Sequence, residues 1–145
     1  VSLATDLIVG FPGETEAQFR NTVQLLSDIR FDTVHIAAYS PRPGTTSARK
    51  LRDDIASSEK KRRLQEVEKL QANIASEINA KLLGHNMEVL VEGKKKGKWY
   101  GRTRTDKLVF FEDEAYWLGQ LVNIEVQKTS PWALQGSLKP RKPKD

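Results

Sequence analysis

The chain has 145 residues, 38% of them hydrophobic and 30% charged, with a formal net charge of +5. These values are typical of one ordinary globular domain or two small ones, and no apolar run approaches the roughly 20 residues that a membrane-spanning helix needs. The absence of Cys excludes disulfides and thiolate chemistry, and the only two His residues, His35 and His85, show no metal-ligand spacing.

The positive charge lies in the second half of the chain. Residues 1–80 carry 11 Lys or Arg and 11 Asp or Glu, whereas residues 81–145 carry 13 against 8. A basic half of this kind favours a polyanionic partner such as nucleic acid. A merely solubilising basic surface is the alternative.

The first elements predict a βαβ unit. Residues 3–11 form an apolar run bounded by Gly and Pro, which predicts a strand buried on both faces, as in a parallel sheet. Thr15 and Gln18 have the spacing of a capping box, and the apolar residues after them predict a helix to about Arg30. Residues 33–39 predict a second strand, so the crossover should be right-handed.

A long helix is predicted from about Ser58 to Leu83, after Pro41 and Pro43 have ended the second strand. Gly84 then stands where helices often end. The apolar stripe of this helix consists of Leu64, Val67, Leu70, Ile74, Ile78 and Leu82.

Beyond Gly84 the sequence changes to short β-rich runs separated by turn signals. These runs cover residues 87–92, 98–103, 107–112, 121–127 and 132–138. Five short strands at this spacing predict a small antiparallel β-barrel over residues 85–139. The fold class is therefore an α+β composite, with an α/β part over residues 1–84, the barrel, and a disordered basic tail at 140–145.

The loop at residues 10–14 (GFPGE) lies between strand and helix, where α/β folds place ligand loops. No Lys-Ser or Lys-Thr follows, so it is not a P-loop. Glu14 occupies the positive end of the helix that an anion would need. A ligand with hydroxyls or an ammonium group would suit this loop better, and a tight turn without a ligand is the alternative.

Asp6 is a carboxylate within an apolar strand, and burying it unpaired would cost several kcal/mol. We therefore expect Asp6 to have a partner or to face a polar cavity. Arg42 follows the next strand, so both side chains could face one pocket; a hydrogen bond from Asp6 to a nearby loop is equally compatible. His35 is expected at the edge of the core rather than in catalysis.

A basic and aromatic cluster follows in the barrel. Cations neutralise phosphates, and aromatic rings and guanidinium planes stack on unpaired bases. Both kinds of group close together predict an RNA-binding face, and a solvated charge run is the alternative. The cluster consists of Lys94, Lys95, Lys96, Lys98, Trp99, Tyr100, Arg102, Arg104 and Lys107. The core and rim of the barrel are expected to contain Phe110, Phe111, Trp117 and Trp132.

Four motifs, in order, resemble one enzyme family. TDLIVGFPGET (5–15) and AYSPRPGT (38–45) are similar to the last two strand motifs of the radical-SAM methylthiotransferases. VLVEG (89–93), GRTR (101–104) and LGQLVNIEV with LQGSL (118–138) resemble their terminal RNA-binding barrel, the TRAM domain. YSPRPGT and GRTR are most similar to the tRNA branch, which acts on N(6)-dimethylallyladenosine.

This resemblance implies a cytoplasmic enzyme that methylthiolates adenosine 37 in the anticodon stem-loop of tRNA. It would use S-adenosylmethionine and two 4Fe–4S clusters, with its active site at the carboxyl end of a partial TIM barrel. The residues implied on the S-adenosylmethionine side are Asp6, Ile8, Gly10, Phe11, Glu14 and Arg42.

The chain departs from the family because it lacks the three-cysteine motif and any Cys to hold iron. We therefore expect the chain alone to be inactive and to bind no cluster, and its apolar strands to favour self-association. A stand-alone RNA-binding module remains an alternative. Two further alternatives are the branches that modify a ribosomal-protein aspartate or threonylcarbamoyladenosine.

Overall fold

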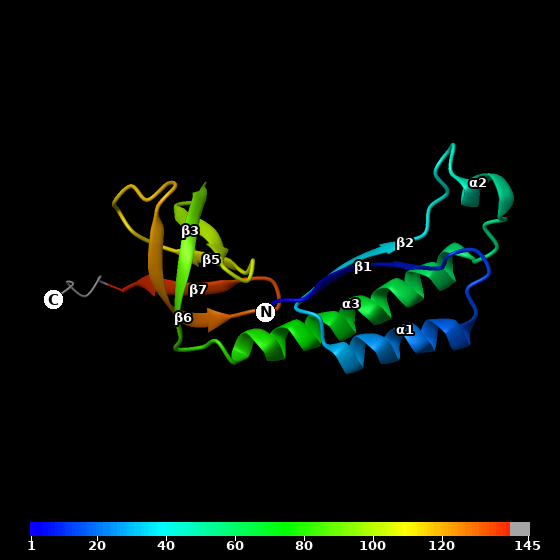
Figure 1. Ribbon diagram of the computed structural model, residues 1–145, viewed down its shortest axis with the longest axis horizontal. Coiled ribbons are helices and arrows are strands. Elements are labelled where there is room, and N and C mark those ends of the chain that lie inside the picture. The colour runs from blue at the N-terminus through cyan, green and yellow to red at the C-terminus, as the bar shows by residue number, and fades with distance from the viewer. Residues whose placement is uncertain (140–145) are drawn as a thin grey trace. The chain divides into compact units, whose positions relative to one another are not determined.

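A computed structural model describes residues 1–139, and the predicted tail at 140–145 lies outside the described residues. The chain divides into two compact units (Figure 1). Residues 3–74 form the first, which we call the α/β unit. Residues 1–2 and residues 75–139 form the second, the barrel unit.

The α/β unit contains the predicted βαβ arrangement. Strands β1 (Ala4–Val9) and β2 (Thr33–Ala38) pair in parallel, with helix α1 (Glu16–Ile29) between them in sequence. Helix α1 and the long helix α3 (Ser57–Ala80) run side by side along one face of the two strands (Figure 1). The core of this unit is formed by Val9, Phe19, Leu26 and Val67.

The prediction that the first strand is buried on both faces is wrong. Val9 is buried, but Asp6 and Ile8 are exposed, Ile8 to 55%. His35, which faces Asp6 across the parallel register, is also exposed. Because Asp6 is exposed to solvent, it needs no buried partner.

The ends of the helices follow local side-chain chemistry. Thr15 Oγ1 accepts from the Gln18 N–H at 3.2 Å and Gln18 Oε1 accepts from the Thr15 N–H at 2.9 Å, which confirms the capping box. A short helix, α2 (Thr46–Lys50), was not predicted; Thr45 caps it by accepting from the Ala48 N–H. Helix α3 ends at Ala80 rather than at Leu83.

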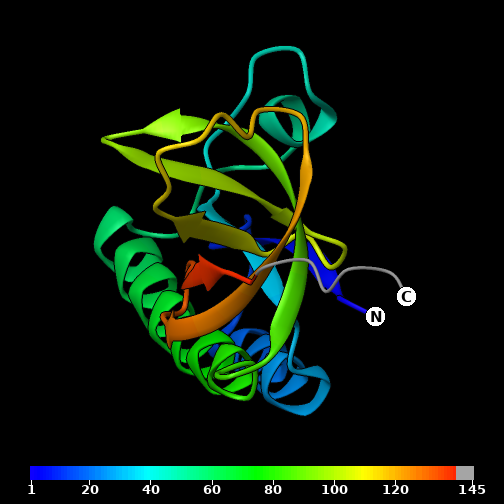
Figure 2. The same cartoon turned by 90° about the vertical axis from the view of Figure 1, so that its left-hand side faces the viewer.

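The barrel unit contains five strands, as predicted. Strand β3 (Asn86–Lys95) is followed by β4 (Lys98–Thr103), β5 (Leu108–Phe111), β6 (Leu121–Thr129) and β7 (Leu134–Leu138). They close in the order β3-β4-β5-β7-β6, and Figure 2 shows them curving around a common interior. The barrel is mixed rather than antiparallel, because β5 and β7 are parallel. A closed barrel with an odd number of strands cannot alternate direction at every pair.

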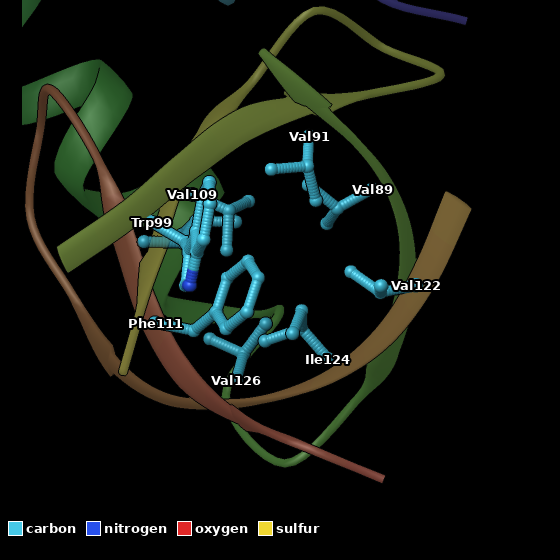
Figure 3. Close-up of a cluster of buried hydrophobic side chains, with 9 residues drawn as sticks. Val89, Val91, Trp99, Val109, Phe111, Val122, Ile124 and Val126 are labelled. Carbon is cyan, nitrogen blue, oxygen red and sulfur yellow. The ribbon is translucent and has the colours of Figure 1, made fainter. Parts of the chain in front are cut away.

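The barrel interior is filled by apolar side chains that alternate along each strand (Figure 3). The largest are Trp99 and Phe111, which lie among Val, Ile and Leu residues. Two glycines allow close strand approach: a Cβ on Gly101 would lie 2.1 Å from the Leu90 carbonyl oxygen, and one on Gly136 would lie 2.0 Å from that of Glu125.

Candidate functional sites

The loop after β1 is closed by its own glutamate. Gly10 and Gly13 have φ values of 71° and 81°, in the left-handed region that favours glycine. Glu14 Oε1 accepts from the Gly10 N–H at 2.9 Å, and the Glu14 N–H donates to the Phe11 carbonyl at 2.9 Å. The carboxylate of Glu14 therefore fixes the conformation of the loop.

Arg63, a buried residue of α3, forms hydrogen bonds to this loop. Arg63 is 4% exposed, and its Nη1 donates to Glu14 Oε1 at 2.6 Å and to the Glu14 carbonyl at 3.0 Å. Its Nε donates to Glu59 Oε1 at 2.9 Å. Hydrogen bonds from Arg62, the larger contribution, and from Arg63 lower the pKa of Glu59 to about 2.

Lys60, one turn earlier, joins the ends of both strands. Its Nζ donates to the Tyr39 carbonyl at 3.1 Å and to Asp53 Oδ1 at 2.6 Å. Its aliphatic stem lies under Gly10, where a Cβ would be 2.5 Å from Lys60 Cγ. The Gly13 N–H donates to Asp54 Oδ1 at 2.8 Å. The segment before α3 thus also stabilises the loop after β1.

The sequence did not predict roles for Lys60 and Arg63, although it contained a signal for them. Both residues stand at helical spacing from Val67, so they lie on the same face of α3 as its apolar stripe, nearer to the start of the helix. Cations at such positions must be buried, and buried cations need acidic partners. Their partners lie in separate loops, which the sequence pattern alone does not bring together.

The residues predicted to lie on the S-adenosylmethionine side of the active site are found in three places. Asp6 and Ile8 are exposed on β1, while Gly10, Phe11 and Glu14 form the loop. The Phe11 ring lies edge-on to Tyr39, with centroids 5.2 Å apart. Arg42 is exposed in the loop after β2, and among residues 1–139 no ion pair joins it to Asp6.

The predicted basic cluster begins at the hairpin between β3 and β4. Lys96 and Gly97 form its two-residue turn with φ values of 50° and 81°, as a type I′ turn requires. Lys94, Lys95 and Lys96 are all exposed. Within the described part of the chain, Lys95 and Lys96 have no ion-pair partner, so the hairpin tip carries uncompensated positive charge.

Three other cations of the cluster, Lys98, Arg102 and Arg104, are near carboxylates. Arg104 Nη2 lies 2.7 Å from Glu88 Oε1, and Lys98 Nζ lies 3.6 Å from Glu112 Oε1. The Arg102 Nε atom lies 3.9 Å from Asp106 Oδ1. Such exposed ion pairs contribute little free energy, so these cations can leave their carboxylates and contact phosphate groups instead.

The prediction that Trp99 stacks on a base is wrong, because the ring lies inside the barrel and is 4% exposed. Its Nε1 donates to the Asp113 carbonyl at 3.2 Å, and Lys94 Nζ lies 5.0 Å from the ring centroid. Tyr100, the next residue of β4, points outward because side chains alternate along a strand. Tyr100 is therefore the aromatic residue of the cluster that can face a ligand.

Four other aromatic residues were expected in the core and rim. Phe111 is buried and Trp117 packs against the core, whereas Phe110 is partly exposed on the outer face of β5. Trp132 is 69% exposed, and so is Tyr116, for which no role was predicted. The barrel surface therefore presents more aromatic area than the sequence pattern indicates.

No group of three or more His, Asp or Glu side chains within residues 1–139 is placed to hold a metal ion. No helix in this range has the length and apolar character needed to cross a membrane.

Residues 80–139 match the TRAM domain family. The chain is also similar over 95% of its length to proteins named tRNA-2-methylthio-N(6)-dimethylallyladenosine synthase. The identity is 51% for the protein of Dehalococcoides mccartyi (strain 195), 53% for that of Roseiflexus sp. and 42% for that of Aquifex aeolicus. The aligned regions are 33%, 30% and 31% of those proteins.

The chain thus spans about a third of the length of the curated relatives that it matches. A solved multidomain protein with nucleic acid binding domains from Streptococcus pneumoniae matches 42% of this chain and 24% of its own, at 25% identity and a TM-score of 0.36. The resemblance to tRNA methylthiotransferases with a TRAM domain, inferred from the motifs, is confirmed by the curated relatives and the domain match.

Proposed function

We propose that this chain, similar to the carboxyl-terminal part of tRNA methylthiotransferases, serves in an enzyme that methylthiolates C2 of N(6)-dimethylallyladenosine at position 37 of tRNA, and that its barrel binds the tRNA. The observation that carries this proposal is the exposed Lys94–Lys96 hairpin tip on a TRAM barrel, next to outward-facing Tyr100. The named activity of relatives similar over 95% of the chain supports it.

The chemistry of the intact enzyme would require S-adenosylmethionine and two 4Fe–4S clusters. This chain has no Cys, so the thiolate ligands of the clusters would come from residues outside it. We propose that the chain alone is inactive. Stoichiometric iron–sulfur absorbance after reconstitution of the purified chain would contradict this.

For S-adenosylmethionine, we propose two kinds of residue, which lie on β1 and in the loops that follow β1 and β2. Asp6, Ile8, Phe11 and Arg42 are accessible and would line the cofactor side of the enzyme. Glu14 is already bonded to the Gly10 N–H and to Arg63, so its role would be to hold Gly10 and the loop in position.

On the barrel, the proposed roles follow from exposure and charge. Tyr100 would stack on an unpaired base, while the cations of the cluster would contact phosphates of the anticodon stem-loop. These cations are Lys94, Lys95, Lys96, Lys98, Arg102, Arg104 and Lys107.

The experiment is a salt titration of tRNA binding. Replacing Lys95 and Lys96 with Gln should weaken binding and flatten the plot of log K against log salt by about 1.4–1.8, since each phosphate contact contributes about 0.7–0.9. The matched control replaces the exposed Lys61 and Lys69 of α3 with Gln, which changes the net charge equally.

An equal loss in both double variants would mean that only net charge matters, which would contradict a specific hairpin contact. If tRNA binding is unaffected by salt and by the Lys95 and Lys96 changes, the RNA assignment fails. Binding of a ribosomal protein by the same hairpin would then favour the branch of the family that modifies a ribosomal-protein aspartate.

We also propose that the chain self-associates through β1 and β2. Leu3 is 47% exposed and Ile8 is 55% exposed, and the two strands form a two-stranded sheet. Exposed apolar strands of this kind pair readily with another chain. Light scattering at several concentrations should show an increasing mean mass, and a constant monomer mass would contradict the proposal.

A further inference from the structure

We propose that the outer face of β5 and β7 contains a pocket for one unpaired nucleobase, with Phe110 as its stacking wall. This inference rests on the proposed RNA binding and deepens it, because it assigns a base site separate from the basic hairpin tip.

The pocket has a volume of about 370 Å³ and lies on the outside of the barrel. This volume falls within the range of about 300–1,000 Å³ that is typical of sites for small molecules. The side chains around it include Lys98, Phe110, Gln127, Lys128, Gln135 and Ser137.

The aromatic wall is held in place by the barrel backbone. Phe110 is paired with Tyr100 across β4 and β5, and their ring centroids are 6.2 Å apart. Tyr100 in turn lies over Gly93, where a Cβ would be 2.7 Å from the Tyr100 hydroxyl. Both rings are partly exposed, so each has an ordered aromatic surface that a base can contact.

Two amide side chains lie beside this wall. Gln135 faces Phe110 in the β5–β7 register and is exposed. Gln127, on β6, donates from Nε2 to Ser137 Oγ at 3.0 Å. Amide groups offer both donors and acceptors, which match the edges of an unstacked base.

The charges around the pocket favour a nucleotide over an acidic or apolar peptide. Lys128 is exposed, and Lys98 reaches the opposite side. The carboxylate that lines the pocket, Glu112, is exposed and lies 3.6 Å from Lys98. Two lysines flanking an aromatic wall can contact the phosphates on either side of the stacked base.

The test compares two RNA hairpins of equal length, one with a seven-nucleotide loop of unpaired bases and one closed by a minimal loop. Phe110→Leu should weaken binding of the large-loop RNA about 5- to 150-fold, the range for losing one base stack. It should leave the salt slope and the binding of the minimal-loop RNA unchanged. Phe110→Tyr keeps an aromatic ring and should restore tight binding.

Tyr116→Leu is the matched control, because it removes an aromatic ring that is 69% exposed and does not line this pocket. Gln135→Leu should also weaken large-loop binding, which keeps the test valid if Phe110→Leu lowers stability. If salt-dependent RNA binding is unaffected by Phe110→Leu and Gln135→Leu, the base pocket is refuted while the proposed function stands. If the unaltered chain binds neither RNA, both fail.

Discussion

Replacing Arg63 with Met should destabilise the α/β unit by about 3–5 kcal/mol, the usual cost of leaving one partner of a buried ion pair uncompensated. The side chain of Arg63 is 5% exposed and that of Glu14 is 14% exposed, so solvent does not screen the pair. Without Arg63, the Glu14 carboxylate keeps the Gly10 N–H as its donor among residues 1–139, and the Glu14 carbonyl loses the Arg63 donor as well.

The control is Arg62→Met on the same helix. Arg62 is 43% exposed and pairs with Glu16, Glu59 and Glu66 at the surface, where solvent weakens such pairs. Both substitutions remove one positive charge and keep a good helix former. Their difference therefore measures the effect of burial.

The assay is urea unfolding followed by two signals. Circular dichroism at 222 nm reports mainly α1 and α3, whereas the fluorescence of Trp99, Trp117 and Trp132 reports the barrel, because all three Trp residues lie there. Arg63→Met should move the first transition and leave the second nearly unchanged. Equal shifts for Arg62→Met and Arg63→Met would contradict a larger contribution of the buried Arg63–Glu14 pair.

Two further predictions concern stability. Gly101→Ala should destabilise the barrel by about 1–3 kcal/mol, because its Cβ would lie 2.1 Å from the Leu90 carbonyl oxygen. Trp fluorescence during urea unfolding measures this loss of stability, and an unchanged unfolding midpoint would contradict the close approach of the two strands. The pKa of Glu59 is lowered from 4.5 to about 2, so its stabilising effect should be complete above pH 4.5 and be lost as the pH falls towards 2. Thermal melts of Glu59→Gln should show a weaker dependence on pH in this window, and an identical pH profile would show that the lowered pKa does not stabilise the fold.

Local chemistry made several elements predictable. The spacing of Thr15 and Gln18 located the start of α1, and the β-rich run at 98–103, between two turn signals, has the bounds observed for β4. The number of barrel strands followed from turn signals and period-two runs. The mixed direction could also have been deduced, since five strands in a closed ring require one parallel pair.

The error at Trp99 has a simple origin. Lys98, Tyr100 and Arg102 occupy alternate positions of one strand, so they share a face, and Trp99 must point to the other. The sequence of β4 contains this alternation, but the predicted cluster groups its residues by composition and does not separate the two faces of the strand. Separating the two faces of β4 would have placed Trp99 in the core.

The contacts of Lys60 and Arg63 belong to a different class. Lys60 bonds to Asp53 and to the Tyr39 carbonyl, and Arg63 bonds to Glu14, which is 49 residues away. The sequence shows only that these cations occupy an apolar face. Which carboxylate neutralises each one depends on how α3 packs against the strands, and only the folded structure gives that.

The most direct test of the central claim is an NMR titration of the ¹⁵N-labelled chain with an anticodon stem-loop RNA. The largest amide shift changes should lie in the hairpin from Lys94 to Lys98 and on the outer face of β4 and β5, including Tyr100 and Phe110. These changes should decrease as salt is added. Shift changes confined to other surfaces of the barrel, or none at all, would contradict the assignment of this face to RNA.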